Sequence, residues 1–352
     1  MNKESKIYLA GHDGLVGSAI FKELKKQGYT NIITRHHSEL DLRNQNLTDL
    51  FFQSQKPEYV FLAAAKVGGI VANYKYKAEF IYDNIMIASN VIHASWKNGV
   101  KKLLNLGSSC IYPKLAPQPL KEEYLLSGYL EETNDAYAMA KIAAIMLCNS
   151  FNQQYGTNFI SAMPTNLYGP GDNFNLETSH VLPAIVRKMH LGKCLELNDW
   201  EAINRDLNKN PIEGITGSSL EEQKISILNK YGIARGKNGV AVTLWGDGSP
   251  GREFLYSKDL AEAVVFMMEN VDSGDLPLGF LNIGSGEDQT IKELAEVIGN
   301  IVGFTGQILW DKKKPNGTPR KLLDVSQINK LGWKQRVSLR DGISILYEKY
   351  IS

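Results

Sequence analysis

Short apolar runs alternate with longer amphipathic segments through the first half of the chain. The runs have the β-branched and aromatic content of buried strands and lie at 6–10, 31–34, 59–65, 103–106 and 159–162. Between them, apolar positions three and four residues apart predict helices that follow the first run to about residue 27 and span 78–98 and 135–155. Strands that alternate with helices predict an α/β fold with a Rossmann-like, doubly wound parallel sheet, which binds ligands at the carboxyl ends of its strands.

The alternation breaks down after Gly169. Helical patterns follow at 179–191, 197–209 and 218–231, then strands at 241–244 and 280–284 with a helix at 257–269 between them, and a last helix from Leu339. We therefore expect a sheet domain over 1–165, to which segments near 242–286 return. Residues 166–241 and 287–352 should form a smaller mixed α/β lobe.

Composition excludes several classes of protein. The 352 residues carry a formal net charge of +1, which indicates no surface for nucleic acid or an anionic membrane. No apolar run reaches the roughly 20 residues of a membrane span, and the N-terminus shows no signal region. Cys110, Cys148 and Cys194 are too widely spaced for a disulfide framework or a zinc site, so we expect no metal and a cytoplasmic location.

Three glycines follow the first predicted strand at a spacing typical of dinucleotide-binding loops. Such glycines allow a sharp turn, a close approach to a pyrophosphate, and tight packing of the following helix. A simple strand-to-helix turn is the alternative, but the strand before it and the helix after it favour a dinucleotide site. The predicted phosphate loop consists of Gly11, His12, Asp13, Gly14, Leu15, Val16 and Gly17.

The second predicted strand ends in Arg35-His36-His37. Sites that prefer NAD usually place a carboxylate here for the ribose hydroxyl, whereas basic groups favour the 2′-phosphate of NADP. We therefore predict NADP, bound mainly through Arg35, with a solvated basic turn as the alternative. Asp41 and Leu42 could lie near the adenine, and the role of Asp41 stays open.

Tyr137 and Lys141 lie four residues apart in a predicted helix, so their side chains share one face. Ser108 follows the strand at 103–106. A free tyrosine titrates near about 10, and Lys141 together with an oxidised nicotinamide would lower that pKa. Tyr137 could then protonate a carbonyl oxygen that receives a hydride while Ser108 holds the oxygen. An exposed helix pair is the alternative.

Motifs along nearly the whole chain, apart from about 194–240, point to one family. They lie at 10–12, 63–73, 107–114, 164–170, 179–181, 252–254 and 314–321. Together they resemble the extended short-chain dehydrogenase/reductases that act on nucleotide sugars, and among these the GDP-L-fucose synthases. The resemblance implies a nucleotide-sugar-binding lobe and a homodimer paired through the helices at 78–98 and 135–155.

The resemblance also implies catalytic roles. Ser108, Tyr137 and Lys141 match the reductase triad, while Cys110 and His180 match the base and acid of an epimerase. These roles are chemically sensible, because a ketone acidifies the protons on its neighbouring carbons. A free cysteine titrates near about 8.5, so Cys110 would need a charged neighbour. Without the resemblance, Cys110 would be read as a small core residue and His180 as a helix-start residue.

Further contacts follow from the resemblance. Cofactor contacts are implied at Leu106, Gly107, Lys141, Pro164, Asn166, Leu167 and His180, and substrate contacts at Lys188, Trp245, Arg252 and Asp311. The chain departs from the family at Asp13 and His37, positions where relatives hold the 2′-phosphate, which leaves NADP against NAD open. It also departs in a longer stretch at 194–240, which could line the sugar pocket, form a subunit contact or be a passive insertion.

The implied activity is that of an NADPH-dependent, bifunctional 3,5-epimerase and 4-reductase that converts GDP-4-keto-6-deoxy-D-mannose to GDP-L-fucose. The alternative is a relative that acts on a different GDP-4-keto sugar, such as a GDP-6-deoxy-4-keto-heptose of surface polysaccharide synthesis. The longer stretch at 194–240 motivates this alternative.

Overall fold

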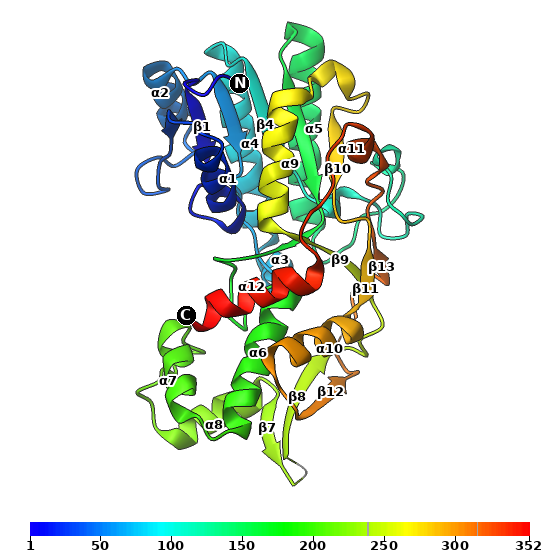
Figure 1. Ribbon diagram of the computed structural model, residues 1–352. Helices are drawn as coiled ribbons and strands as arrows, with labels where there is room; N and C mark the ends of the chain where they lie inside the picture. The colour runs from blue at the N-terminus through cyan, green and yellow to red at the C-terminus, as the bar shows by residue number, and fades with distance from the viewer. Residues whose placement is uncertain (238, 315) are drawn as a thin grey trace.

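Six parallel strands form the larger sheet of the protein (Figure 1). The computed structural model describes residues 1–237, 239–314 and 316–352. The strand order is β10-β5-β4-β3-β1-β2, so the late strand β10 returns to the sheet next to β5. This order confirms the predicted doubly wound sheet. The strands are β1 (Ile7–Ala10), β2 (Ile32–Ile33), β3 (Tyr59–Leu62), β4 (Lys102–Leu106), β5 (Phe159–Pro164) and β10 (Phe280–Ile283).

Helices cover both faces of this sheet. Because alternate residues of a strand point to opposite faces, Ile7 and Leu9 pack under α1 (Leu15–Lys26) and α9 (Ser257–Asn270). Tyr8 and Ala10 pack on the other side, in the cluster formed with α2 (Gln45–Gln55), α4 (Lys77–Lys97) and α5 (Asp135–Tyr155). Both faces of the sheet therefore carry apolar side chains, and helices cover both, as is usual for parallel sheets.

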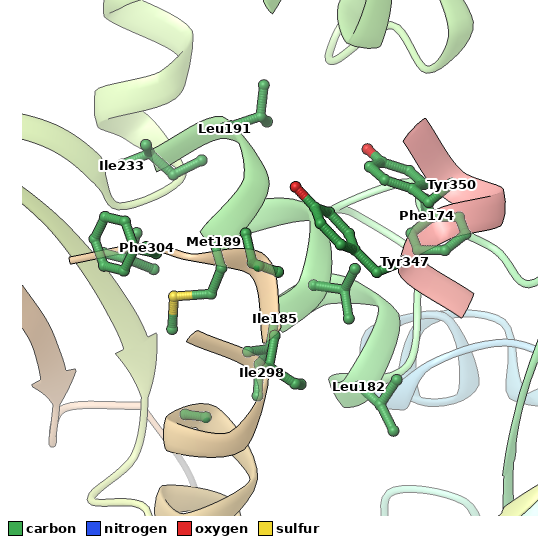
Figure 2. Close-up of a cluster of buried hydrophobic side chains, with 14 of the residues drawn as sticks. Phe174, Leu182, Ile185, Met189, Leu191, Ile233, Ile298, Phe304, Tyr347 and Tyr350 are labelled. Carbon is green, nitrogen blue, oxygen red and sulfur yellow. The ribbon is translucent and has the colours of Figure 1, made fainter. Parts of the chain in front are cut away.

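The smaller lobe has its own core, drawn in Figure 2. A sheet of β7 (Ile233–Gly236), β8 (Gly239–Trp245) and β12 (Gln307–Asp311) packs against α6 (Val181–Glu196) and α10 (Ile291–Val302). The C-terminal helix α12 (Leu339–Ile351) closes the other side of α6 with Tyr347 and Tyr350.

The expected return to the large sheet near residue 242 is wrong for β8. This strand pairs with β12 and β7 of the lobe, and only α9 and β10 belong to the sheet domain. The apolar alternation of one strand predicts its buried face but not its pairing partner, which explains the error.

A third sheet lies at the junction of the two domains (Figure 1). It contains β6 (Asn166–Tyr168), β9 (Gly251–Tyr256), β11 (Asp288–Thr290) and β13 (Arg320–Lys321). Glu253 of β9 is fully buried, and its carboxylate accepts hydrogen bonds from the backbone N–H groups of Gly286 (2.7 Å) and Leu323 (2.9 Å). The backbone carbonyl of Glu253 accepts a bond from the Asn166 amide (2.8 Å). Glu253 thereby links three segments that meet at the junction.

The stretch at 194–240 is part of the lobe rather than a loose appendage. It contains α7 (Trp200–Lys209) and α8 (Glu221–Lys230). Arg187 of α6 is fully buried and forms an ion pair with Asp206 of α7, at 2.7 Å, and Asp206 also accepts a hydrogen bond from Tyr350. The pair therefore fixes α7 to the lobe core.

Short elements complete the fold. They are α3 (Ile70–Lys75), α11 (Ser326–Lys330), η1 (Ser109–Ile111), η2 (Glu122–Tyr124) and η3 (Ser273–Asp275). Among the described residues, none of the helices combines the length and the apolar character that crossing a bilayer requires.

Candidate active site

In the glycine loop after β1, backbone segments approach one another more closely than side chains at Gly11 and Gly17 would allow. Gly11 has a φ of +84°, and an added Cβ there would lie 2.6 Å from the backbone nitrogen of Ala64. A Cβ on Gly17 would lie 1.9 Å from the carbonyl oxygen of Gly11, whereas a Cβ on Gly14 would make only an ordinary contact with that oxygen, at 3.6 Å. Helix α1 begins without a side-chain cap, and within the described chain the buried Nδ1 of His12 has no partner. These features fit the pyrophosphate of a dinucleotide.

The corner beyond β2 contains both signs of charge. Arg35 donates to the carbonyl of Thr34 (2.7 Å), and its guanidinium lies 5.6 Å from the centre of the Phe51 ring. Asp13 contacts Nδ1 of His36 at 2.7 Å and Nε2 of His12 at 3.1 Å. The ligating atoms of His12, Asp13 and His36 lie within 4.8 Å of one another, so they could hold a cation, which the cysteine spacing did not suggest.

The negative charge of Asp41 is balanced by Arg43, a residue to which the sequence patterns assigned no role. Arg43 donates to both of its carboxylate oxygens, at 2.9 and 2.8 Å, and these hydrogen bonds lower the pKa of Asp41 to about 2. The exposed His37 lies farther away, 3.9 Å from Asp41. The neighbouring Leu42 is buried in the helical layer, where its carbonyl accepts a bond from Asn90 (2.9 Å). The carboxylate at 41 therefore adds little net negative charge to this corner.

Helix α5 presents Tyr137 and Lys141 toward the end of β4. The ammonium of Lys141 lies 5.6 Å from the centre of the Tyr137 ring and donates a 2.7 Å hydrogen bond to the carbonyl of Leu106. Gly107 and Ser108 follow directly, and Ser108 caps the short helix η1 by accepting from the N–H of Cys110 (3.4 Å). The structure therefore brings the three predicted reductase residues together.

Burial has the largest effect on the pKa values of Tyr137 and Lys141. It raises the pKa of Tyr137; the nearby Cys110 raises it further, and a hydrogen bond with Ser108 opposes the shift. It also lowers the pKa of Lys141 to about 8. The expected lowering of the Tyr137 pKa by Lys141 is not seen in this structure, where the only lowering comes from Ser108. The neutral phenol that results is the form that can donate a proton.

Cys110 lies on the same turn as Ser108. Its buried thiol donates to the Ser108 hydroxyl at 3.0 Å and lines a cavity of about 10 Å³, room for about one water molecule. The other residues around this cavity are Tyr112, Pro113, Lys114, Gln118, Leu120, Glu131, Thr318, Arg320 and Lys321.

His180 immediately precedes α6. Its side chain reaches solvent, yet the protein around it lowers the pKa of the imidazole, because the charged form loses hydration there. The N–H of Gly69, after β3, bonds to the carbonyl of Thr178 (3.1 Å) and fixes the loop that leads to His180.

The predicted cofactor residues of the fifth strand lie beside the same edge. Pro164 ends β5 and is buried, and Asn166 and Leu167 are half-buried in β6. The carboxyl ends of parallel strands meet at one edge of a sheet, so these residues share an edge with the glycine loop and with Ser108.

The predicted substrate residues gather around β8 and β9. Lys188 of α6 donates to the carbonyl of Thr243 (3.1 Å), and burial lowers its pKa to about 8. Trp245 ends β8 with 54% of its surface exposed and pairs in register with Asp311 of β12. Arg252 lies half-buried on β9, in register with Lys321 of β13.

Two groups near the site had no assigned role in the sequence. Arg43 is only two residues from Asp41, but nothing in the spacing shows that its guanidinium turns back on that carboxylate. Lys321 belongs to the motif at 314–321, of which Pro315 lies outside the described residues, and this motif was the available signal for it.

Comparisons with known proteins agree with this site. The NAD dependent epimerase/dehydratase family matches residues 7–207 and 217–284. GDP-L-fucose synthase 1 of Arabidopsis thaliana is 48% identical and covers 99% of this chain and 94% of its own length. GDP-L-fucose synthase of Escherichia coli (strain K12) is 43% identical, covering 100% and 98%.

A solved structure of MlghC, a GDP-mannoheptose C4 reductase from Campylobacter jejuni with NADP bound, is also similar. It is 43% identical, has a TM-score of 0.88, and is matched over 100% of both chains. With the Rossmann-like sheet and the glycine loop, these likenesses show that the chain belongs to the NAD dependent epimerase/dehydratase family, the extended short-chain dehydrogenase/reductases, among the relatives of the GDP-L-fucose synthases.

Proposed function

We propose that this protein is a bifunctional enzyme that uses NADPH to convert GDP-4-keto-6-deoxy-D-mannose to GDP-L-fucose by 3,5-epimerisation and 4-reduction. The observation that supports it most is the 3.0 Å contact between the Cys110 thiol and the Ser108 hydroxyl. A ketone oxygen held by Ser108 lies within reach of the groups for both reactions, so one carbonyl can serve both steps.

Epimerisation needs a base and an acid. As a thiolate, Cys110 would remove a proton from a carbon next to the C4 ketone, and the hydroxyl of Ser108 would stabilise the negative charge that moves onto the C4 oxygen. His180 would return a proton to the opposite face of the same carbon, so proton number is conserved. The lowered pKa of His180 favours the neutral imidazole, so His180 has to take up a proton before it can act as the acid; once protonated, it is a stronger acid than a free imidazolium.

Reduction uses the neighbouring helix. When bound, NADPH supplies the hydride to C4. Tyr137 donates its phenolic proton to the C4 oxygen, for which the neutral form favoured by burial is the correct one. Lys141, held by the Leu106 carbonyl, would bond the nicotinamide ribose beside it.

The lobe provides groups suited to GDP. Lys188 and Arg252 are cations that can pair with the diphosphate, and a guanidinium does so through two parallel bonds. The exposed face of Trp245 can stack on a ring, and Asp311 lies beside it in register. We propose the domain division that follows from this: residues 1–165 with α9 and β10 bind the cofactor, and the lobe binds the nucleotide sugar.

A second candidate is an enzyme that acts on a GDP-4-keto-heptose. The match to the GDP-mannoheptose C4 reductase spans the whole chain, including α7 and α8. The match to the Escherichia coli GDP-L-fucose synthase also covers 100% of this chain, so α7 and α8 by themselves do not favour the heptose. Cys110 and His180 favour the epimerising reaction over reduction alone.

The location and the oligomeric state of the enzyme are inferred from its cysteines and its exposed apolar side chains. The cysteines are all unpaired and buried, which supports a cytoplasmic enzyme. A homodimer through α4 and α5 is supported by exposed apolar side chains on these helices, Tyr82 on α4 and Met139 and Met146 on α5.

The test offers GDP-4-keto-6-deoxy-D-mannose and GDP-6-deoxy-4-keto-heptose separately, each with NADPH or NADH, and follows cofactor oxidation. We expect faster oxidation with NADPH and the mannose-derived ketone. Faster oxidation with the heptose would establish the second candidate, and no oxidation with either sugar would refute the reductase function.

A further inference from the structure

The thiol of Cys110 needs a positive neighbour to act as a base, and several cations lie around it. Lys114, Arg320 and Lys321 line its cavity, Lys141 approaches from α5, and Arg252 lies on β9 next to Lys321. Charged or titratable groups that face the thiol or Lys321 are therefore Tyr137, Glu131 and these five cations.

Two of these five cations are already paired with carboxylates. Lys114 forms an ion pair with Glu131 at 3.2 Å, and Thr318 also bonds that carboxylate at 3.3 Å. Arg320 forms a two-pronged pair with Asp288, at 2.6 and 2.8 Å. Carboxylates therefore compensate the positive charges of Lys114 and Arg320, so these two cations would stabilise a thiolate only weakly.

The side chains of Lys141 and Arg252 are each held by a backbone carbonyl. Lys141 donates to the carbonyl of Leu106 on the Tyr137 side of the thiol. Arg252 donates to the carbonyl of Gly251 (2.7 Å). Both are thus oriented by the backbone.

Lys321 differs from all of them. Among the residues that the structure describes, its side chain forms neither an ion pair nor a hydrogen bond, although it lines the same small cavity as Cys110. Burial lowers the pKa of Lys321, the opposite charge of a Cys110 thiolate raises it, Arg252 lowers it, and Glu131 raises it. The pairing of β13 with β9 fixes its backbone, so it is held at the cavity without a partner of its own.

We propose that Lys321 is the positioning residue of the epimerase base: its side chain forms an ion pair with Cys110 and holds it as a thiolate. The proton leaves the thiol and is retained by the lysine amine, so the pair as a whole stays neutral. This inference rests on the proposed function for its catalytic meaning, but the ion pair can be measured without substrate. A thiolate prepared in this way can take the sugar proton directly.

The experiment titrates the thiolate of the full-length protein by its ultraviolet absorbance, with the Cys110→Ser variant subtracted as the background. The test variant is Lys321→Met, and Lys321→Arg restores the charge. The control is the double variant Lys114→Met/Glu131→Gln, which removes a neutral ion pair from the wall of the same cavity. Thermal unfolding checks that every variant is folded.

We expect Lys321→Met to move the midpoint of the titration up by about one pH unit or more, which is roughly a tenfold loss of thiolate below the midpoint. Lys321→Arg and the double variant should keep the parent curve. An unchanged curve in Lys321→Met, or an equal shift in the double variant, would overturn the proposal.

A second readout separates this inference from the proposed function. In heavy water, Lys321→Met should lose roughly tenfold in deuterium incorporation at C3 and C5 and keep the parent affinity for NADPH. If the thiolate of the parent protein depends on Lys321 but no deuterium is incorporated, the epimerase function is refuted and the ion pair is still supported. Normal incorporation in Lys321→Met would refute the role of Lys321 while leaving the epimerase intact.

Discussion

The hydroxyl oxygen of Ser108 lies 3.0 Å from the sulfur of Cys110, on the single turn that follows β4. In the proposed enzyme Cys110 acts in the epimerisation, whereas Ser108 serves both the epimerisation and the reduction. Their contact means that the oxygen of one ketone can be polarised by the serine while the thiol faces the adjacent carbon. Variants on either side of this turn should therefore separate the two activities.

Replacing Tyr137 by Phe should abolish reduction. The phenolic proton is lost while the packing of α5 and the bond from Lys141 to the Leu106 carbonyl stay in place. We expect a loss of about 10²–10⁴-fold in the rate of NADPH oxidation, typical of a missing general acid, with NADPH affinity close to the parent value. Turnover near that of the parent enzyme would remove Tyr137 as the acid.

Replacing Arg35 by Leu should weaken NADPH binding more than NADH binding. The guanidinium beside Phe51 is the group expected to bond the 2′-phosphate, and a charged hydrogen bond contributes about 1.5–3 kcal/mol. Calorimetric titration with both cofactors measures the difference. Equal losses for the two cofactors would show that Arg35 has only a packing role.

The affinity for GDP should fall as the pH rises past about 8. Burial lowers the pKa of Lys188 to about 8, so below this pH the side chain is a cation and above it the charge is lost. Between about pH 7 and about pH 9 we expect a loss of up to about tenfold in GDP affinity. Lys188→Arg stays charged and should show a flat profile. The titration is run without cofactor, because the pKa of Lys141 is also about 8 and this residue is expected to contact the cofactor. A sloping profile in Lys188→Arg would show that another group causes the pH dependence.

Replacing Arg187 by Met should destabilise the lobe. The change leaves Asp206 buried without its cationic partner, which typically costs about 3–5 kcal/mol in the free energy of unfolding. The control Arg205→Met breaks an exposed pair with Glu201 on α7, the helix that carries Asp206, and the urea midpoint should barely move. Similar midpoints for both variants would mean that α7 does not depend on the buried pair.

Much of the site follows from local sequence patterns. The helical period placed Tyr137 and Lys141 on one face, and the three glycines predicted a loop that approaches a ligand closely. The end of β3 was less predictable, because the apolar run continues to residue 65 while the strand stops at Leu62. The chain leaves the sheet there, and the N–H of Lys66 bonds to the Asn84 side chain instead (2.9 Å).

The remaining parts depend on pairing between distant segments. Lys321 lines the cavity beside Cys110 only because β13 pairs with β9 at the junction, and β8 joins the lobe only because β12 is its neighbour. Neither pairing leaves a mark on the local periodicity of the chain. The burial that raises the pKa of Tyr137 is likewise a property of the assembled site.

The most direct test follows the reaction of GDP-4-keto-6-deoxy-D-mannose in heavy water, with and without NADPH, for the parent enzyme and Cys110→Ser. The account predicts deuterium at C3 and C5 without NADPH, reduction to GDP-L-fucose with it, and loss of the deuterium in Cys110→Ser at unchanged NADPH affinity. NADPH oxidation by the parent enzyme with no deuterium at either carbon would contradict it, because the site would then reduce the ketone without epimerising it.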